Sequence, residues 1–394
     1  MPFAAALSEH PLATHATGEV VGHVLERLGG RRPDVALLFV TDAHGGALED
    51  IGATVRTALD PGALLGVTAV SVAGGAREVE ERPAVSLWAG CFGDDAGQRS
   101  LRAVRPVRLS GVDAVGASDA AFAGFPDDVD PEHELLMVLV DPFSFPAPAF
   151  LDEVERRWPG LAVIGGLASA GRGPGGNRLL LDDVLFDDGA VGVVLPAGRG
   201  IATVVSQGCR PVGAPYVITR SESNVVHELG GQSALARLEQ VVADLSPDER
   251  SIAQRGGLHI GRVIDERRTH FGPGDFLIRA VLGADRESGA VAIGDEAPVG
   301  ATLQFQVRDA ASADEDLREL LSGRRADGAL LFTCNGRGVG LFGEPDHDAA
   351  VLDAVVGGGA TAGMFCAGEL GPVGGRNFLH GYTASMILFT DPLG

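Results

Sequence analysis

The chain has 394 residues, of which 45% are hydrophobic and 21% are charged, so it is long enough to form two or three domains with sizeable cores. Its formal net charge of −22 would repel phosphate backbones and anionic lipid surfaces, so we expect neither nucleic acid nor a membrane as a partner. The four cysteines are widely spaced and form no zinc-binding pattern. We therefore expect a cytoplasmic protein with reduced thiols and no cofactor.

One order of elements occurs three times along the chain. After a first helix over Thr17–Leu28, a strand, a helix, an apolar run ending in a Gly-rich turn and a closing strand follow one another. Short apolar runs bounded by Gly and Pro are typical of strands. The three copies cover residues 34–89, 134–195 and 329–389. We interpret them as three diverged strand-helix-strand-turn-strand units of an α/β (α+β) fold.

A different region separates the second and third copies. Val225–Leu245 is amphipathic and predicts a single helix entered through two glycines. Ser312 is expected to N-cap a further helix over Ala313–Leu321. Between them, alternating apolar and polar residues predict half-buried antiparallel strands over Asp275–Gly283, Ala290–Asp295 and Ala301–Ala310. Gly and Pro between residues 212 and 224 mark the best domain boundary.

Five segments in the second half carry a resemblance to a known family. They read QGCRPVGAPYVITRSESNVVHELGGQSAL, GDFLIRAVLGADRESGAVAIGD, FQVRDA, FTCNGRGVGLFG and CAGELGPVGGRNFLHGYTAS, in that order from Gln207 to Ser385. Together they resemble the FIST-domain family. The first half resembles it through DVALLFV and LLGVTAVSVAGG. The resemblance implies a FIST N-terminal domain over residues 1–211 and a FIST C-terminal domain over residues 212–394, with mainly antiparallel sheets packed together and helices on their outer faces.

The resemblance also implies a function. FIST proteins are cytoplasmic sensory modules of signal transduction that bind small ligands such as amino acids. Because the two halves occupy the whole chain, we expect no output domain here and a separate protein partner for signalling. One alternative is a protein-interaction scaffold or homo-oligomer with no small ligand. The sequence does not favour an enzyme, although a reaction using Cys366 with His380 or Glu369 is a third hypothesis.

The most polar of the Gly-rich turns lies in the third copy. It carries Glu369, Arg376, Asn377 and His380 within twelve residues. Arginine can bind a carboxylate with two parallel hydrogen bonds, and glutamate can accept hydrogen bonds from an ammonium group, so these residues are candidates for binding an amino acid. Alternatively, Glu369 pairs with Arg376, and the other two side chains bind backbone groups of the turn.

Two further turns supply candidate ligand-binding residues. Asn335 and Arg337 follow the first strand of the third copy, next to the polar turn, because neighbouring strands bring their end loops together. Ser169 and Arg172 lie in the turn of the second copy, whose backbone amides could bind an anion. Solvent-exposed Gly-rich turns are the alternative for both. We expect the ligand to lie between the two halves.

Overall fold

The computed structural model describes residues 2–92, 104–112, 121–197, 200–268, 270–272, 274–358 and 360–390. They form helices together with mixed and antiparallel sheets, which confirms the α+β class. The chain divides into two compact units. Unit 1 comprises Met1–Val205, Leu321–Leu379 and Thr383–Gly394, and unit 2 comprises Ser206–Leu320 and His380–Tyr382. The units therefore interleave along the sequence. The family boundary at residues 211 and 212 remains a prediction.

Unit 1 contains the three predicted copies, here called repeats. The first repeat has β2 (Val35–Thr41), α3 (Leu48–Leu59), β3 (Ala63–Ala69) and β6 (Val85–Gly90). The second has β9 (Glu134–Val140), α4 (Ala147–Arg157), β10 (Ala162–Leu167) and β13 (Ala190–Pro196). The third has β22 (Gly328–Cys334), α8 (Val339–Phe342), α9 (His347–Val356), β23 (Thr361–Cys366) and β26 (Thr383–Phe389).

The same strand pairing occurs in every repeat. The two strands that flank the helix are parallel, as a helical crossover requires, and they are β2 with β3, β9 with β10, and β22 with β23. The closing strand, β6, β13 or β26, pairs antiparallel with the first strand of its own repeat. The sequence pattern therefore predicted the repeat correctly.

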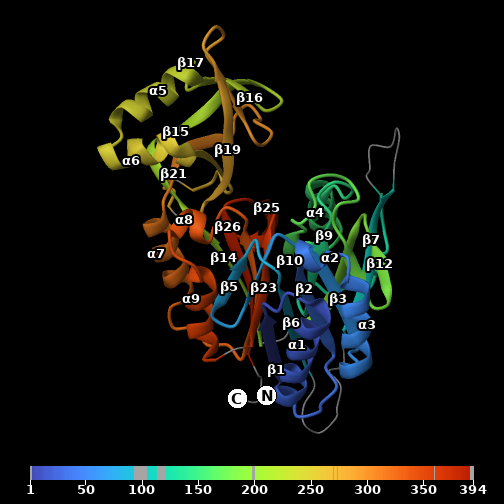
Figure 1. Cartoon of the computed structure of the whole chain (residues 1–394). Helices are drawn as coiled ribbons and strands as arrows, with labels where there is room; N and C mark the ends of the chain where they lie inside the picture. Colours follow the sequence, from blue (N-terminus) through green and yellow to red (C-terminus); the bar gives the residue numbers. More distant parts are fainter. Residues whose placement is uncertain are drawn as a thin grey trace. The chain divides into compact units, whose positions relative to one another are not determined.

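In the first and third repeats the Gly-rich turn is part of a β-hairpin rather than a loop, which corrects our interpretation of the polar turn in the third repeat, whereas in the second repeat residues 168–178 form a loop that precedes the hairpin. The hairpins are β4 (Ser71–Gly74) with β5 (Arg77–Glu80), β11 (Leu179–Leu181) with β12 (Val184–Phe186), and β24 (Glu369–Val373) with β25 (Arg376–His380). Each hairpin pairs with a strand of another repeat: β4 with β23, β11 with β3, and β24 with β10. In Figure 1 the blue hairpin that contains β5 extends the sheet of the red β23, with β4 between the two strands. This exchange connects the three sheets in a cycle.

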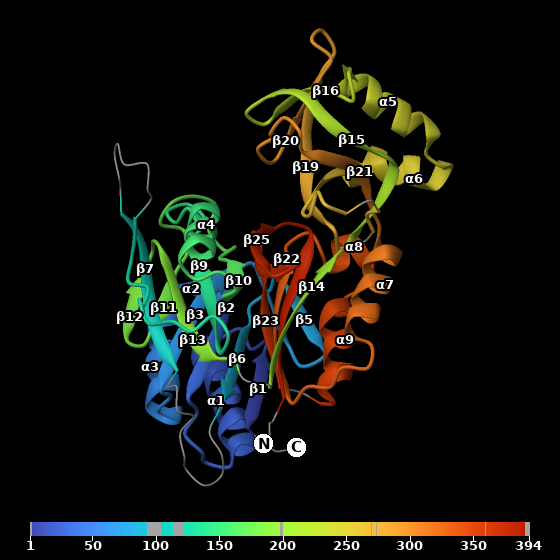
Figure 2. The same ribbon diagram turned by 180° about the vertical axis from the view of Figure 1, so that it is seen from behind.

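Apolar side chains from all three repeats form one central core in unit 1, including Trp88, Ile164 and Phe332. The indole N–H of Trp88 donates to the carbonyl of Ala360 at 3.0 Å, which satisfies the polar end of the largest buried side chain. Helices lie on the outer faces, as predicted; α1 and α3 cover the first sheet (Figure 2). The remaining elements are β1 (Phe3–Ser8), α1 (Ala13–Leu28), α2 (Asp42–Gly45), β7 (Arg105–Val112), β8 (Ala121–Ala123) and β14 (Ile201–Gln207).

Unit 2 is built around an antiparallel barrel. The strands follow the order β15, β21, β18, β19, β20, β16, and β15 also pairs with β16, which closes the ring. Alternate residues, among them Ile260 and Phe305, form the barrel core. The elements are β15 (Cys209–Glu222), β16 (Val225–Leu229), β17 (Gln232–Ser233), α5 (Ala234–Asp244), α6 (Pro247–Ile252), a π-helical turn (Ala253–Gly257), β18 (Leu258–Val263), β19 (Phe276–Asp285), β20 (Ala290–Ile293), β21 (Thr302–Arg308) and α7 (Ala310–Leu321).

Two of the predicted helices in this region were wrong in extent. The segment predicted as one helix over Val225–Leu245 first forms β16 and β17, because Gly230 and Gly231 have φ of 55° and 73° and turn the chain. The helix α5 starts only at Ala234. The helix α7 starts three residues earlier than predicted, because the Asp309 carboxylate, rather than Ser312, accepts a hydrogen bond from a free N–H of the first turn.

Candidate functional site

The structure gives the four predicted residues of the third hairpin different environments. Glu369 is completely buried, and its Oε2 accepts hydrogen bonds from the N–H and the hydroxyl of Thr383 at 3.2 and 2.8 Å. Arg376 is exposed, with its guanidinium carbon 5.5 Å from the centre of the Phe378 ring. A buried carboxylate and an exposed guanidinium do not form the predicted clamp in this state of the hairpin.

Asn377 and His380 also have separate positions. The side-chain amide of Asn377 accepts a hydrogen bond from the N–H of Val163 at 2.8 Å and donates one to the carbonyl of Leu161 at 2.7 Å. Asn377 therefore binds backbone groups, but those at the start of β10 in the second repeat and not those of its own turn. His380 is buried and belongs to unit 2, whereas the rest of β25 belongs to unit 1.

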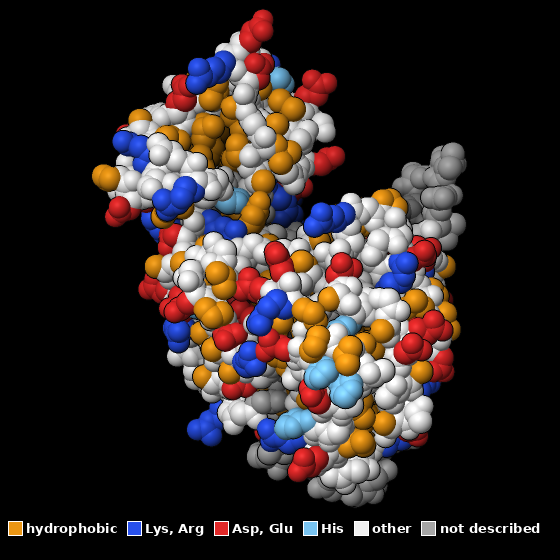
Figure 3. Space-filling model, in the orientation of Figure 1, with side chains coloured by type: hydrophobic (Ala, Val, Ile, Leu, Met, Phe, Trp, Pro, Cys, Tyr) orange, Lys and Arg blue, Asp and Glu red, His pale blue; other side chains and the backbone are white. Residues whose placement is uncertain are grey.

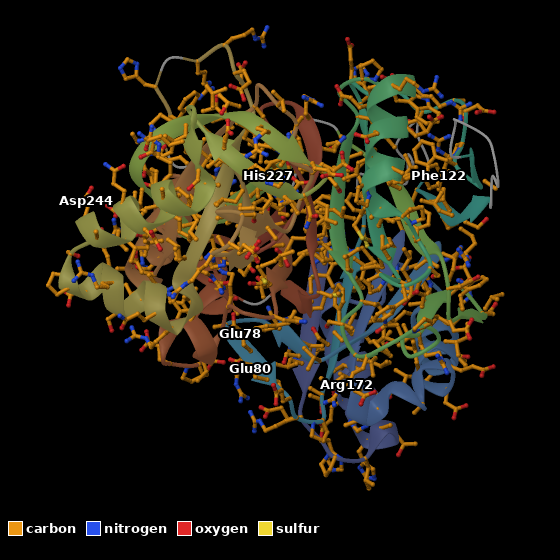
Figure 4. All side chains as sticks on the ribbon, turned by 90° about the horizontal axis from the view of Figure 1, so that it is seen from above. Glu78, Glu80, Phe122, Arg172, His227 and Asp244 are labelled. Atoms are coloured by element: carbon orange, nitrogen blue, oxygen red, sulfur yellow. The ribbon has the colours of Figure 1, made fainter. Side chains whose placement is uncertain are left out.

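Ser169 and Arg172 differ in the same way. The Ser169 hydroxyl donates to the carbonyl of Phe365 at 2.6 Å and accepts from the N–H of Val70 at 3.0 Å, so it links the three repeats at one point. Arg172 is exposed and lies well apart from the hairpin β4–β5 in Figure 4. The binding role of both residues remains a prediction.

Arg337 belongs to a group of buried polar and charged side chains in unit 1. Its side chain is fully buried and donates two hydrogen bonds to Asp348, at 2.6 and 2.8 Å. Asp348 also accepts a hydrogen bond from the Thr333 hydroxyl at 2.7 Å and lies 3.0 Å from Nδ1 of His347. Asn335, predicted beside Arg337, is exposed, and its backbone N–H donates to the carbonyl of Cys366.

A carboxyl group from the first repeat completes this group. Glu78 of β5 is only 3% exposed, and its Oε1 accepts a hydrogen bond from the N–H of Ala349 in the first turn of α9, at 3.0 Å. Its Oε2 has no hydrogen-bond partner among the residues that the structure describes. We call Glu78, Thr333, Arg337, His347 and Asp348 the Glu78 cluster.

Further acidic groups border the Glu78 cluster. Asp346 accepts a hydrogen bond from the backbone N–H of Glu78 at 2.7 Å, and Glu80 accepts one from the N–H of Val339 at 2.9 Å. Glu78 and Glu80 lie together on β5 in Figure 4. Acidic and basic side chains are interspersed on the surface of unit 1 around β5 (Figure 3). Together with these two neighbours, the two carboxyl groups of the Glu78 cluster surround one arginine.

The electrostatics of the two central carboxyl groups are opposite. Burial, followed by the negative charge of Asp348, raises the pKa of Glu78 from 4.5 to about 8, so this carboxyl carries a proton at neutral pH. Burial would also raise the pKa of Asp348, but the Arg337 guanidinium and the hydrogen bonds from Arg337, His347 and Thr333 hold it well below its usual range. The cluster therefore contains an ionised pair beside a neutral acid.

Glu78 is not among the residues predicted from the sequence, although a comparison of the repeats distinguishes it. In the hairpin of the second repeat, Leu180 pairs with Gly66 of β3 on one side and with Leu185 of β12 on the other. In the hairpin of the first repeat, Ala73 has the equivalent position: it pairs with Gly363 of β23 on one side and with Glu78 of β5 on the other. Glu78 therefore stands where the other hairpin has leucine. A carboxyl group at an apolar position of a repeat is the signal that marks this site.

The hypothesis of a nucleophilic cysteine finds no support in the environment of Cys366. This thiol is completely buried, and burial together with Glu369 and Cys334 raises its pKa well above the usual value. A nucleophilic thiol requires the opposite shift. In the part of the chain that the structure describes, no group of three or more His, Cys, Asp or Glu side chains could hold a metal ion, and no helix is long and apolar enough to cross a bilayer.

Comparison with known proteins gives a consistent result along the whole chain. A family model of the FIST N domain matches residues 34–232, and one of the FIST C domain matches residues 234–372. An uncharacterized protein of Mycobacterium tuberculosis strain H37Rv is 42% identical over 392 residues, which cover 98% of both chains. An uncharacterized protein of Mycobacterium bovis is 43% identical over 389 residues, which cover 97% of both chains.

Proposed function

The chain belongs to the FIST family, whose domains are associated with ligand sensing in signalling, and we propose that it senses a small polar ligand that carries an ammonium group. The ligand class includes amino acids and related amines. The proposed site is the Glu78 carboxyl at the contact between hairpin β4–β5 and helix α9. The observation that carries the proposal is a buried carboxyl oxygen, Glu78 Oε2, with no hydrogen-bond partner among the described residues.

The surroundings of Glu78 favour a cation over an anion. The Arg337 guanidinium is already bound by Asp348 with two hydrogen bonds. The other charged groups around Glu78 are acidic: Asp348, Glu80 and Asp346 all raise the pKa of Glu78. An ammonium group would be attracted by these carboxylates, whereas a carboxylate would be repelled.

Binding of a cation would exchange with the proton of Glu78. With a pKa of about 8, the carboxyl is neutral at pH 7, and an ammonium group at Oε2 favours the ionised form. Binding then releases the proton, so the affinity rises with pH up to about 8. This coupling gives the proposed site a chemical signature that a nonspecific ionic contact on the surface lacks.

The proposed role also includes a separate partner protein that receives the signal, in the cytoplasm. No disulfide joins the four cysteines, all of which lie in described parts of the chain, and this is compatible with a reducing compartment. The contact between the exchanged hairpin and α9 offers a route for a signal, because a ligand at Glu78 touches elements of two repeats.

Thermal unfolding with a panel of single amino acids and linear amines tests the proposal. A ligand that binds only the folded state raises the midpoint. We expect at least one ammonium compound to raise it, and Glu78→Gln to abolish the rise while preserving the acceptor for the Ala349 N–H. Glu26→Gln, on the exposed face of α1, is the matched control and should respond like the natural chain. If no compound shifts the midpoint, or if Glu78→Gln still responds, the proposal is wrong.

A further inference from the structure

A second pair of buried polar side chains lies on the barrel of unit 2. His259 of β18 and Gln306 of β21 are directly opposite each other in the antiparallel pairing. Their neighbours Ile260 and Phe305 point into the barrel core, so the alternation along the strands directs His259 and Gln306 to the outer face. Directly opposite side chains on one face are within contact distance.

Both side chains are buried and incompletely hydrogen-bonded. Gln306 is 0% exposed and His259 is 4% exposed. Within the described residues, three of their atoms have no hydrogen-bond partner: Oε1 and Nε2 of Gln306, and Nδ1 of His259. By contrast Gln304, two residues earlier on the same strand, donates to the carbonyl of Gly213 at 2.7 Å. Buried polar atoms without partners are rare in native proteins, so these three atoms on two facing side chains require a partner that the described residues do not supply, either a water molecule or a ligand.

The protonation state of His259 determines whether its partner must donate or accept a hydrogen bond. Burial lowers the pKa of His259 to about 4. The positive charge of Arg308 also lowers this pKa, whereas a hydrogen bond with the backbone of Gly257 raises it. The ring is therefore neutral at pH 7. A neutral imidazole has one nitrogen that donates and one that accepts, so Nδ1 can serve as an acceptor. Gln306 adds one acceptor oxygen and one donor nitrogen.

Neighbouring aromatic and cationic groups fix the imidazole. The Tyr382 ring meets the His259 ring edge-on, with centroids 4.2 Å apart. The guanidinium carbon of Arg308 lies 4.9 Å from the centre of the same tyrosine ring. Gly261 follows His259 on the outer face and leaves room for the side-chain amide of Gln306, because a Cβ at position 261 would lie 2.7 Å from Gln306 Nε2. The site is therefore held in place by several elements of unit 2.

We infer that His259 and Gln306 form a binding site for a primary carboxamide. The carbonyl oxygen of a carboxamide would accept from Nε2 of Gln306, and its two N–H groups would donate to Oε1 of Gln306 and Nδ1 of His259. All three atoms would then be satisfied by one group. A carboxylate would face two acceptors, and an ammonium group would lack the acceptor that Nε2 requires and would be repelled by Arg308. The site is separate from the Glu78 cluster and does not rest on the proposed function.

Nicotinamide and propionamide are suitable probes, because neither carries an ammonium group that could bind at Glu78. Calorimetric titration of the full chain should show binding of both, and at least tenfold weaker binding of nicotinate and propionate, which replace the amide by a carboxylate. Gln306→Met keeps the volume and removes both polar atoms of the amide, so it should fold and bind the carboxamides at least tenfold more weakly. Gln240→Met, on the exposed face of α5, is the matched control and should bind normally.

A second variant separates the two side chains. His259→Phe keeps an aromatic ring against Tyr382 but removes the Nδ1 acceptor, and we expect it to weaken carboxamide binding about tenfold. The inference is overturned if neither carboxamide binds the natural chain, which would mean that water fills the site, or if the carboxylates bind equally well. It is also overturned if Gln306→Met folds and binds nicotinamide unchanged.

Discussion

Glu78 occupies in β5 the position that Leu185 occupies in β12. In both hairpins this residue lies opposite the one that pairs with the central glycine of a neighbouring repeat, Gly363 or Gly66. The leucine packs against an apolar cluster under α3, whereas the glutamate contacts the first turn of α9. The interface between hairpin β4–β5 and the third repeat is therefore polar where the equivalent interface of hairpin β11–β12 is apolar. Because the hairpins are exchanged between repeats, Glu78 of the first repeat lies against the third repeat.

The buried pair Arg337–Asp348 should be essential for stability. Arg337→Ala leaves the Asp348 carboxylate buried without its cation, and we expect a loss of about 3–5 kcal/mol in the free energy of unfolding. Urea unfolding measures it. Arg318→Ala removes an exposed partner of Asp314 and should cost only about 0.5 kcal/mol. Equal losses in the two variants would show that Arg337 is not buried against Asp348.

Glu78 should make stability depend on pH. Its pKa is about 8 in the folded chain and 4.5 ordinarily, so the folded state retains a proton that the unfolded state has lost between these values. The contribution of protonated Glu78 to the free energy of unfolding is fully present below about pH 4.5. It is lost as the pH rises to about 8, at on the order of 1 kcal/mol per pH unit. Urea unfolding from pH 5 to 8 should show this slope, and Glu78→Gln should lack it. A slope shared by both proteins would have another origin.

Because the hairpins are exchanged between repeats, the stability of the first sheet should depend on Leu180 of the second repeat. Leu180 belongs to the second repeat but lies under α3 of the first, where a Cβ on Gly52 would come within 2.4 Å of its Cδ2. Leu180→Ala should therefore cost about 2–5 kcal/mol in the free energy of unfolding. Val184→Ala, in the exposed part of the same hairpin, should cost almost nothing. If the two variants unfold alike, the hairpin does not pack as described.

Cys366 should be chemically inert in the folded protein. Its thiol is completely buried, and burial with Glu369 and Cys334 raises its pKa, so almost no thiolate forms at pH 8. Mass spectrometry after brief treatment with iodoacetamide should find it unmodified, and modified only after unfolding in urea. The partly exposed Cys91 serves as the internal comparison. Alkylation of Cys366 before Cys91 would restore the hypothesis of a nucleophile.

The repeat architecture was predictable because its signals are local. Apolar runs such as residues 35–41, helical periodicity and Gly-rich turns define each strand and helix without reference to distant residues. The hairpin partners were not predictable in this way. That β4 pairs with β23 depends on contacts between residues almost three hundred positions apart, and the sequence of a hairpin does not specify its neighbour.

The candidate site was predictable only in part. Arg337 was recognised as a polar residue on a Gly-rich turn, but its partner Asp348 lies in what the sequence marks as a helix start, and Glu78 lies in another repeat. Asn377 and Ser169 attracted attention for their polarity, yet their side chains bind backbone groups. Polar residues in turns often satisfy the backbone, and only the structure distinguishes them from ligand-binding groups.

The most direct test of the account is the pH dependence of binding by an ammonium compound that raises the unfolding midpoint. Its affinity is to be measured by calorimetry from pH 6 to 8 for the natural chain and for Glu78→Gln. We predict an affinity that rises up to tenfold per pH unit for the natural chain, because the ligand displaces the proton of Glu78, and no measurable binding for the variant. An affinity independent of pH, or retained in Glu78→Gln, would contradict the assignment of Glu78 as the ligand-binding carboxyl.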